Sequence, residues 1–185
     1  MLPTCEMEGR AAWSAQAANM PVALPWYALQ TKARHEKSVS NHLKMQGMEE
    51  FLPLYKSRRE WSDRVTVVEL PLFGGYVFCR LDRRSMVSAL STPGVIHVLG
   101  YGTEPAPVPD IEISAIRRLL SSKMPATPCP YLKTGVTVRI RHGAMQGLEG
   151  RLERVKNSCR LVLSVHLLQR SVALEVDPES VEVVG

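Results

Sequence analysis

The stretch PLFGGYVFCR, residues 71–80, is the part of the sequence that decides the fold. Two adjacent glycines, Gly74 and Gly75, permit a backbone bend that a residue with a Cβ would resist. The Tyr-Val-Phe run that follows favours a pleated, half-buried strand. Such a bent, aromatic-rich strand belongs either to the core of a domain or to its contact surface, and these residues alone leave both interpretations open.

The size and composition of the chain indicate a globular protein. Its 185 residues, 45% of them hydrophobic, suit one large domain or two small ones with a real core. The formal net charge of +5 allows an anionic partner without requiring one. The four cysteines form no CxxC pair and have no histidine at metal-ligand spacing, so we expect reduced thiols, no metal, no cofactor and a cytoplasmic location.

Neither a membrane span nor a signal peptide is predicted. No run approaches the ~20 apolar residues that a transmembrane helix needs. The N-terminus carries acidic residues in place of the basic region of a signal peptide. Residues 1–25 have no sustained hydrophobic period and end in two prolines, which predicts a flexible tail.

Residues 26–122 predict an α+β domain, an antiparallel sheet flanked by helices. The first helix has one narrow apolar face, at Val39 and Leu43, and Asp82 and Asp110 are suited to capping the second and third helices. The charged run KSRREWSDR, residues 56–64, predicts a hairpin tip or exposed loop. The expected strands are 26–31, 51–55, 65–70, 76–80 and 95–99, and the expected helices are 32–47, 82–91 and a third that begins near residue 110.

The remainder of the chain predicts a linker and a second, all-β domain. Residues 123–134 hold three prolines and no helical period, which is typical of a semi-rigid linker. In residues 135–185 apolar and polar residues alternate between glycine turns. Several short strands in ~50 residues predict a small β-barrel of the SH3-like type, because closure removes exposed edges.

The charge is spread evenly over the two predicted domains. Residues 26–122 carry 13 basic and 10 acidic side chains, a balance of +3, and residues 135–185 carry 7 and 6, a balance of +1. An autonomous high-affinity nucleic-acid binder would need a stronger basic excess. The balance therefore favours a protein as the main partner.

The order of these motifs resembles the NusG family of bacterial transcription elongation factors. The resemblance rests on WYALQT, PLFGGYVF, PGVIHVLGYG, the proline linker and GVTVRIRHGAMQGLEGRLERV, and covers residues 26–185. It implies an N-terminal domain of NusG type and a C-terminal KOW domain. The loop around Trp61, the linker and the ending LVLSVHLLQRSVALEV look closer to specialised paralogues of the RfaH or UpxY type.

The resemblance implies a monomeric elongation or antitermination factor that binds RNA polymerase. In the family the N-terminal domain binds the β′ clamp helices, reaches towards the β subunit and suppresses pausing. Phe73 and Tyr101, at the ends of strands, are expected to be surface anchors. The matching polymerase-binding residues are Gln30, Phe73, Tyr76, Phe78 and Tyr101.

Two further surfaces are implied by the resemblance. In RfaH-type relatives the start of the first helix faces the non-template DNA strand, and the KOW domain recruits the ribosomal protein NusE. Leu168 stands where NusG has an aromatic residue. The loss of the ring still allows NusE as a partner but argues against the termination factor Rho. The matching positions are Lys32, Arg34, His35 and His42 for DNA, and Leu167, Leu168 and Arg170 for the KOW partner.

Other functions remain as alternatives. A housekeeping NusG is one, and a KOW-type RNA-binding, ribosome-associated protein is another, although the latter needs a more basic barrel. An enzyme is disfavoured because the sequence has neither a nucleophile elbow nor a P-loop. The family usually has Phe-Pro-Gly-Tyr where this chain has Phe73-Gly74-Gly75-Tyr76, so we expect a bend that is less pre-organised.

Overall fold

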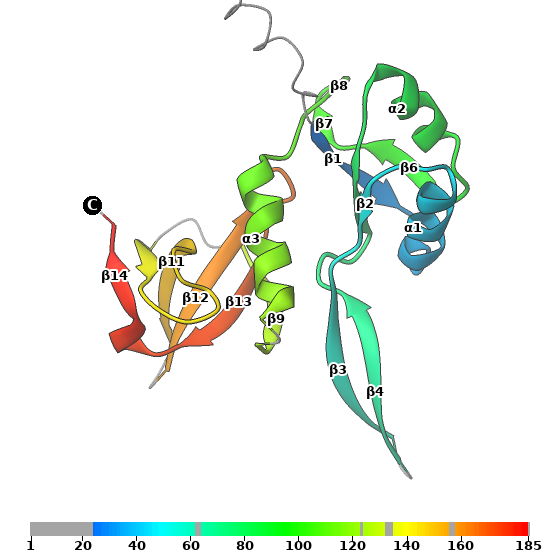
Figure 1. The fold of residues 1–185 in the computed structure, drawn as a ribbon. Helices are drawn as coiled ribbons and strands as arrows, with labels where there is room; N and C mark the ends of the chain where they lie inside the picture. Colours follow the sequence, from blue (N-terminus) through cyan, green and yellow to red (C-terminus); the bar gives the residue numbers. More distant parts are fainter. Residues whose placement is uncertain (1–23, 62–63, 123, 132–134, 156–157, 185) are drawn as a thin grey trace, which may run out of the picture.

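The computed structural model describes residues 24–61, 64–122, 124–131, 135–155 and 158–184 (Figure 1). The tail predicted for residues 1–25 lies almost wholly outside these ranges. We call residues 24–122 the N-terminal half and residues 124–184 the C-terminal half. Among the described residues, no helix is long and apolar enough to span a membrane.

The N-terminal half is built on a four-stranded antiparallel sheet of order β2-β5-β1-β6. Side chains alternate across it. Leu29, Val77 and Cys79 pack with α1 and α2, whereas Ala28 and Phe78 belong to a second buried cluster on the opposite face. The predicted α+β class is confirmed. The strands are β1 (Trp26–Thr31), β2 (Glu50–Phe51), β5 (Tyr76–Arg80) and β6 (Val95–Val98).

The two helices on the first face follow the predicted pattern with one difference. Val39 and Leu43 of α1 (Glu36–Met45) are fully buried, as predicted. The helix starts four residues later than predicted because Arg34 has a φ of +65°, which a right-handed helix excludes. Asp82 caps α2 (Arg83–Leu90) through the backbone N–H groups of Arg84 and Ser85, which confirms its predicted role.

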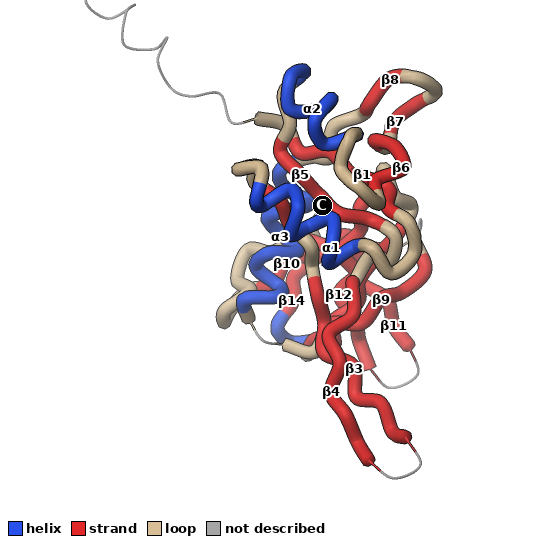
Figure 2. Tube along the Cα trace, turned by 90° about the vertical axis from the view of Figure 1, so that its right-hand side faces the viewer, coloured by secondary structure: helices blue, strands red, loops and turns tan. Residues whose placement is uncertain are grey.

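Two hairpins extend from this sheet. The charged run predicted as a hairpin tip or exposed loop lies at the far end of a hairpin, and its described residues are strand, because β3 (Leu54–Trp61) and β4 (Arg64–Pro71) pair along their full length. Figure 2 shows this ribbon projecting beyond both halves. A shorter hairpin joins β7 (Gly100–Tyr101) to β8 (Glu104–Pro105).

The C-terminal half is a six-stranded antiparallel sheet of order β14-β10-β11-β12-β13-β9. Residues 126–130 form strand β9 on β13, where a linker was predicted. Proline is tolerated there because β9 is an edge strand and needs no donor on its outer side. The strands are β9 (Ala126–Pro130), β10 (Val136–Ile140), β11 (Glu149–Val155), β12 (Ser158–Val165), β13 (Arg170–Val176) and β14 (Val181–Val183).

Helix α3 (Asp110–Ser121), the last helix of the N-terminal half, lies between its sheet and the C-terminal half (Figure 1). Asp110 is its first residue and makes no cap, contrary to the prediction, because its carboxylate pairs with Arg80 instead. Ile113 and Ile116 are buried, and Leu119 is more deeply buried than Leu120. One apolar cluster includes this helix and residues of both halves.

Candidate functional site

An aromatic face occupies the side of the N-terminal sheet that looks away from α1 and α2. The Phe78 ring centroid lies 6.2 Å from that of Phe51 and 5.8 Å from that of Phe73, the latter pair edge to face. These are the separations at which aromatic pairs add stability beyond their burial. The aromatic face consists of Trp26, Phe51, Phe73, Tyr76 and Phe78.

The C-terminal half and α3 cover this face. Phe73 is 1% exposed and Phe78 is fully buried. The apolar cluster that contains both rings continues into Leu168, Val172 and Leu174 of the C-terminal half. Phe73 is therefore buried in this structure, although its position at a strand end predicts an exposed residue, because the chain supplies its own cover.

The N-terminal sheet meets the C-terminal half at the start of β5. The Arg170 guanidinium lies 5.9 Å from the centre of the Tyr76 ring, within the range of a cation–π contact. Leu72 and Leu168 line one pocket between the halves, together with Pro128. The predicted polymerase-binding residue Tyr76 and the predicted KOW-partner residues Leu168 and Arg170 thus lie at one contact and limit access to one another.

Two arginines lie between α3 and the other end of the aromatic face. Arg80 of β5 and Arg117 of α3 lie 4.8 and 4.7 Å from the centre of the Trp26 ring. Arg117 is also 5.0 Å from the centre of the Phe51 ring. Guanidinium groups suit such sites because they are weakly hydrated and stack on rings.

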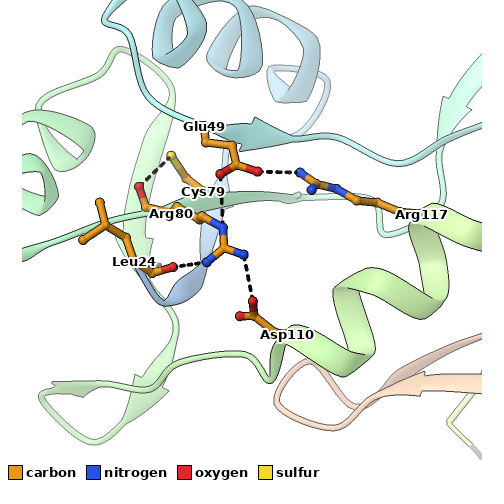
Figure 3. Close-up of polar contacts among 6 residues, drawn as sticks. All are labelled: Leu24, Glu49, Cys79, Arg80, Asp110 and Arg117. Atoms are coloured by element: carbon orange, nitrogen blue, oxygen red, sulfur yellow. Dashed lines mark hydrogen bonds and ion pairs between the residues drawn. The ribbon is translucent and has the colours of Figure 1, made fainter. Parts of the chain in front are cut away.

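Two carboxylates complete this arrangement. Glu49 lies 3.1 Å from Arg80 Nε and 3.1 Å from Arg117 Nη2, so it bridges the sheet and the helix. Asp110 lies 2.7 Å from Arg80 Nη2, and Arg80 also donates to the Leu24 carbonyl (Figure 3). The helix is therefore tied to the N-terminal sheet by charge as well as by packing.

Helix α3 makes separate polar contacts with the C-terminal half. Glu112 Oε1 lies 2.6 Å from His166 Nδ1, and the backbone N–H of His166 donates to the other carboxylate oxygen at 3.3 Å. Arg118 donates to the carbonyl of Gln146 at 2.6 Å. These bonds fasten the C-terminal half to α3 without using the aromatic face.

The remaining predicted polymerase-binding residues lie in two different places. Gln30 is partly buried and pairs with Tyr76 in the register of β1 and β5, so it adjoins the aromatic face. Tyr101 is 78% exposed on the β7–β8 hairpin, outside the buried cluster. The structure therefore brings four of the five predicted residues together.

The predicted DNA-binding residues Lys32, Arg34, His35 and His42 are all exposed. The first three lie just before α1, whereas His42 lies in its last turn. His35 Nδ1 lies 3.0 Å from the Ala33 carbonyl, and His42 Nδ1 lies 2.7 Å from the Ser38 carbonyl. A neutral ring makes such a contact only with its proton on Nδ1, which leaves Nε2 to accept hydrogen bonds from a ligand.

Several residues of the site were missed by sequence reasoning, among them Arg80, Arg117 and Glu36. Arg80 follows Tyr76 and Phe78 at a spacing of two, so strand alternation alone could have placed it on the aromatic face. Arg117 could not have been found, because its partners come from β1 and β2. Glu36 carries no sequence signal for its contact with Gly75.

The thiols near the site are not activated. Burial, reinforced by Glu50 and Glu49, raises the pKa of Cys79 to about 12, so this thiol stays neutral. Burial also raises the pKa of Cys129. In the described part of the chain, no group of three His, Cys, Asp or Glu side chains could hold a metal ion.

Comparison with known proteins finds relatives over most of this chain. Residues 24–117 match the family described as "Transcription termination factor nusG". The chain is 28% identical over 171 residues to the transcription termination/antitermination protein NusG of Vibrio vulnificus, which covers 85% of this chain and 94% of the relative. It is 24% identical over 172 residues to the NusG of Helicobacter pylori, and this match covers 86% of this chain and 98% of the relative.

A solved structure has the same fold. The structure described as "Domain interaction in Thermotoga maritima NusG" superposes with a TM-score of 0.53 at 21% identity, covering 87% of this chain and 97% of that one. The family match includes the whole aromatic face and most of α3. The chain therefore belongs to the NusG family of transcription termination factors.

Proposed function

We propose that this chain binds RNA polymerase during elongation, through its aromatic face with Gln30 and Tyr101, and suppresses pausing or termination. The observation that carries the proposal is the position of the aromatic face, which lies inside the region that matches the NusG family. Large, rigid rings bury much area at small entropic cost, and truncation of a true anchor typically costs ~2 kcal/mol or more. The partner surface we propose is the β′ clamp helices, with the β subunit beyond them.

Docking on this face requires the two halves to separate. Phe73 and Phe78 are almost without solvent exposure, and Arg170 lies on the Tyr76 ring. A partner can reach these rings only when Leu168 and Arg170 move away. The described arrangement is thus a closed form, and polymerase shifts the population by binding the open form.

A nucleic-acid contact is proposed at the start of α1. Lys32, Arg34, His35 and His42 stay exposed in the closed form, and none of them contributes to the cluster between the halves. Lys32 and Arg34 can meet phosphates, and the Nε2 atoms of the histidines can meet base edges of the non-template DNA strand.

For the C-terminal half we propose a KOW-type barrel over residues 135–185, joined to the first domain through residues 123–134, that recruits a further partner. Leu167, Leu168 and Arg170 are the proposed contacts. Leu168 is 7% exposed, so the same separation of halves that frees the aromatic face would free this surface. The ribosomal protein NusE is the partner proposed. Rho is not, because Leu168 lacks a ring.

We propose further that the chain is a specialised, operon-specific factor of the RfaH or UpxY type. Support comes from the loop around Trp61, the proline-rich linker and the ending LVLSVHLLQRSVALEV. A housekeeping NusG role fits the family equally well, and chromatin occupancy separates the two. Occupancy confined to one or a few long operons would support specialisation, and occupancy on most transcribed genes would overturn it.

The polymerase contact is tested with exposed residues, which can be changed without loss of the core. Tyr101→Ala removes a ring that is 78% exposed, and Val67→Ala on the β3–β4 ribbon, 60% exposed, is the matched control. We expect Tyr101→Ala to weaken binding to purified core polymerase about 30-fold, and the control to leave it unchanged. Equal binding of both variants in co-sedimentation would remove Tyr101 from the interface. A native chain that does not bind core polymerase would end the proposal.

A further inference from the structure

Glu36 is a buried carboxylate bonded to the bend that precedes β5. It is 8% exposed at the first residue of α1, and its Oε1 accepts the backbone N–H of Gly75 at 2.8 Å. The Gly75 carbonyl in turn accepts the N–H of Thr31 at 2.8 Å. Both backbone groups of Gly75 are therefore fixed by the segment that leads from β1 into α1.

The bend itself is a four-residue turn that needs outside support. The Tyr76 N–H donates to the Phe73 carbonyl at 3.1 Å, and of the two central glycines only Gly75 has a positive φ, +85°. These features identify a type II turn. Two glycines lose more conformational entropy on ordering than any other pair, so the turn sequence alone selects this shape weakly.

The other end of the same segment is held as well. The Lys32 N–H donates to the Gly94 carbonyl at 2.8 Å. A Cβ at Gly94 would lie 3.2 Å from His35 Cβ, so the segment runs close against the turn before β6. Residues 31–36, which include the exposed basic side chains, are thus fixed between two turns of the sheet.

We propose that Glu36 is a positioning residue that selects the geometry of the Phe73–Tyr76 turn and so places Phe73 and Tyr76 for docking. A carboxylate that accepts a backbone N–H makes a charge-assisted bond, stronger than a neutral one. It supplies from α1 the restraint that the two glycines lack. This inference rests on the proposed function for its effect on polymerase, but its effect on the turn is independent of it.

The turn is tested first, in the full-length chain and without any partner. Hydrogen exchange at the Gly75 amide is measured by NMR in the native chain, Glu36→Ala and Glu36→Gln. We expect exchange to become at least tenfold faster in Glu36→Ala, and an intermediate rate in Glu36→Gln, whose amide oxygen can still accept. Glu104→Ala, which removes an exposed acid on β8, should leave the rate unchanged. Unchanged exchange in Glu36→Ala would overturn the proposal.

The placing of the docking residues is tested by second-site rescue. A Cβ at Gly74 would meet nothing within 4 Å, and proline is favoured at the first central position of a type II turn, so Gly74→Pro should fix the turn without Glu36. We expect Glu36→Ala to weaken binding to core polymerase about tenfold, and Glu36→Ala/Gly74→Pro to recover most of it. Gly74→Pro in the native chain should change binding less than twofold.

The matched control separates positioning from loss of stability. Val39→Ala opens a cavity in α1 without touching the turn, so Gly74→Pro should not restore any binding lost in that variant. Rescue of both variants alike, or of neither, would overturn the positioning role. A native chain that fails to bind polymerase would refute the proposed function alone, and the exchange rates at Gly75 would still decide the role of Glu36.

Discussion

Replacing Leu168 by alanine should open the molecule without unfolding either half. Leu168 is 7% exposed and lines a pocket with Leu72 of the opposite half, so its burial depends on the halves being together. The change removes three carbon atoms from the contact, worth about 2 kcal/mol at ~0.8 kcal/mol per CH₂ group. The equilibrium between closed and open forms should therefore shift about 30-fold towards the open form.

The shift can be followed as a change in distance between the halves. Dyes placed at Met45, which is 85% exposed on α1, and at Val183, 69% exposed on β14, report on separation by single-molecule energy transfer. Val136→Ala, which changes the 53% exposed first residue of β10, is the control and should leave the distribution unchanged. An unchanged distribution for Leu168→Ala, together with a lower melting temperature, would refute the reasoning, because Leu168 would then stabilise only its own sheet.

Three other variants test separate parts of the structure. In Gly100→Ala the new Cβ would lie 1.9 Å from the Glu104 carbonyl oxygen, so the β7–β8 hairpin should be destabilised and polymerase binding should weaken as Tyr101 is displaced. Native chemical shifts for residues 100–105 in this variant would contradict the prediction. Because the pKa of Cys79 is raised to about 12, the native thiol should resist alkylation at pH 8. The free energy of unfolding should fall as the pH rises above ~8.5, because the thiol then ionises in the unfolded chain but not in the folded one, and Cys79→Ala should remove that fall. Hydrogen bonds from Ser85 lower the pKa of the Asp82 carboxyl in the folded chain. Its ionised form therefore stabilises the fold above pH ~3.9, the pKa in the unfolded chain, and this stabilisation disappears as the pH falls through the pKa in the folded chain. An acid titration of α2 that is the same in Asp82→Asn as in the native chain would contradict this.

The strand PLFGGYVFCR illustrates what local sequence can and cannot predict. Its alternation correctly places a strand and puts the rings of Tyr76 and Phe78 on one face of it, because the period of two is a property of the strand itself. Whether that face is core or contact surface depends on residues a hundred positions away, such as Leu168 and Arg170. The sequence order therefore predicts the elements of the N-terminal half well, but not the cover that the C-terminal half provides.

The differences at helix starts and at the linker have local causes. Asp110 has the chemistry of an N-cap, yet an arginine on β5 takes its carboxylate, and sequence cannot rank these two partners. Residues 126–130 look like a linker because prolines weaken strand propensity. They nevertheless pair with β13, because an edge strand needs no backbone N–H donors on its outer side. The basic residues at the start of α1, Lys32, Arg34 and His35, are exposed in the structure, as expected of charged and polar side chains, which seldom lose their contact with water.

The central claim, that the aromatic face is the polymerase-docking face and is covered by the C-terminal half, is tested most directly by hydrogen exchange of the full-length chain with and without core polymerase. We expect polymerase to protect amides of residues 73–80 while exchange at residues 167–171 becomes faster, because docking must displace that cover. Protection confined to the C-terminal sheet, with no change at residues 73–80, would contradict the account.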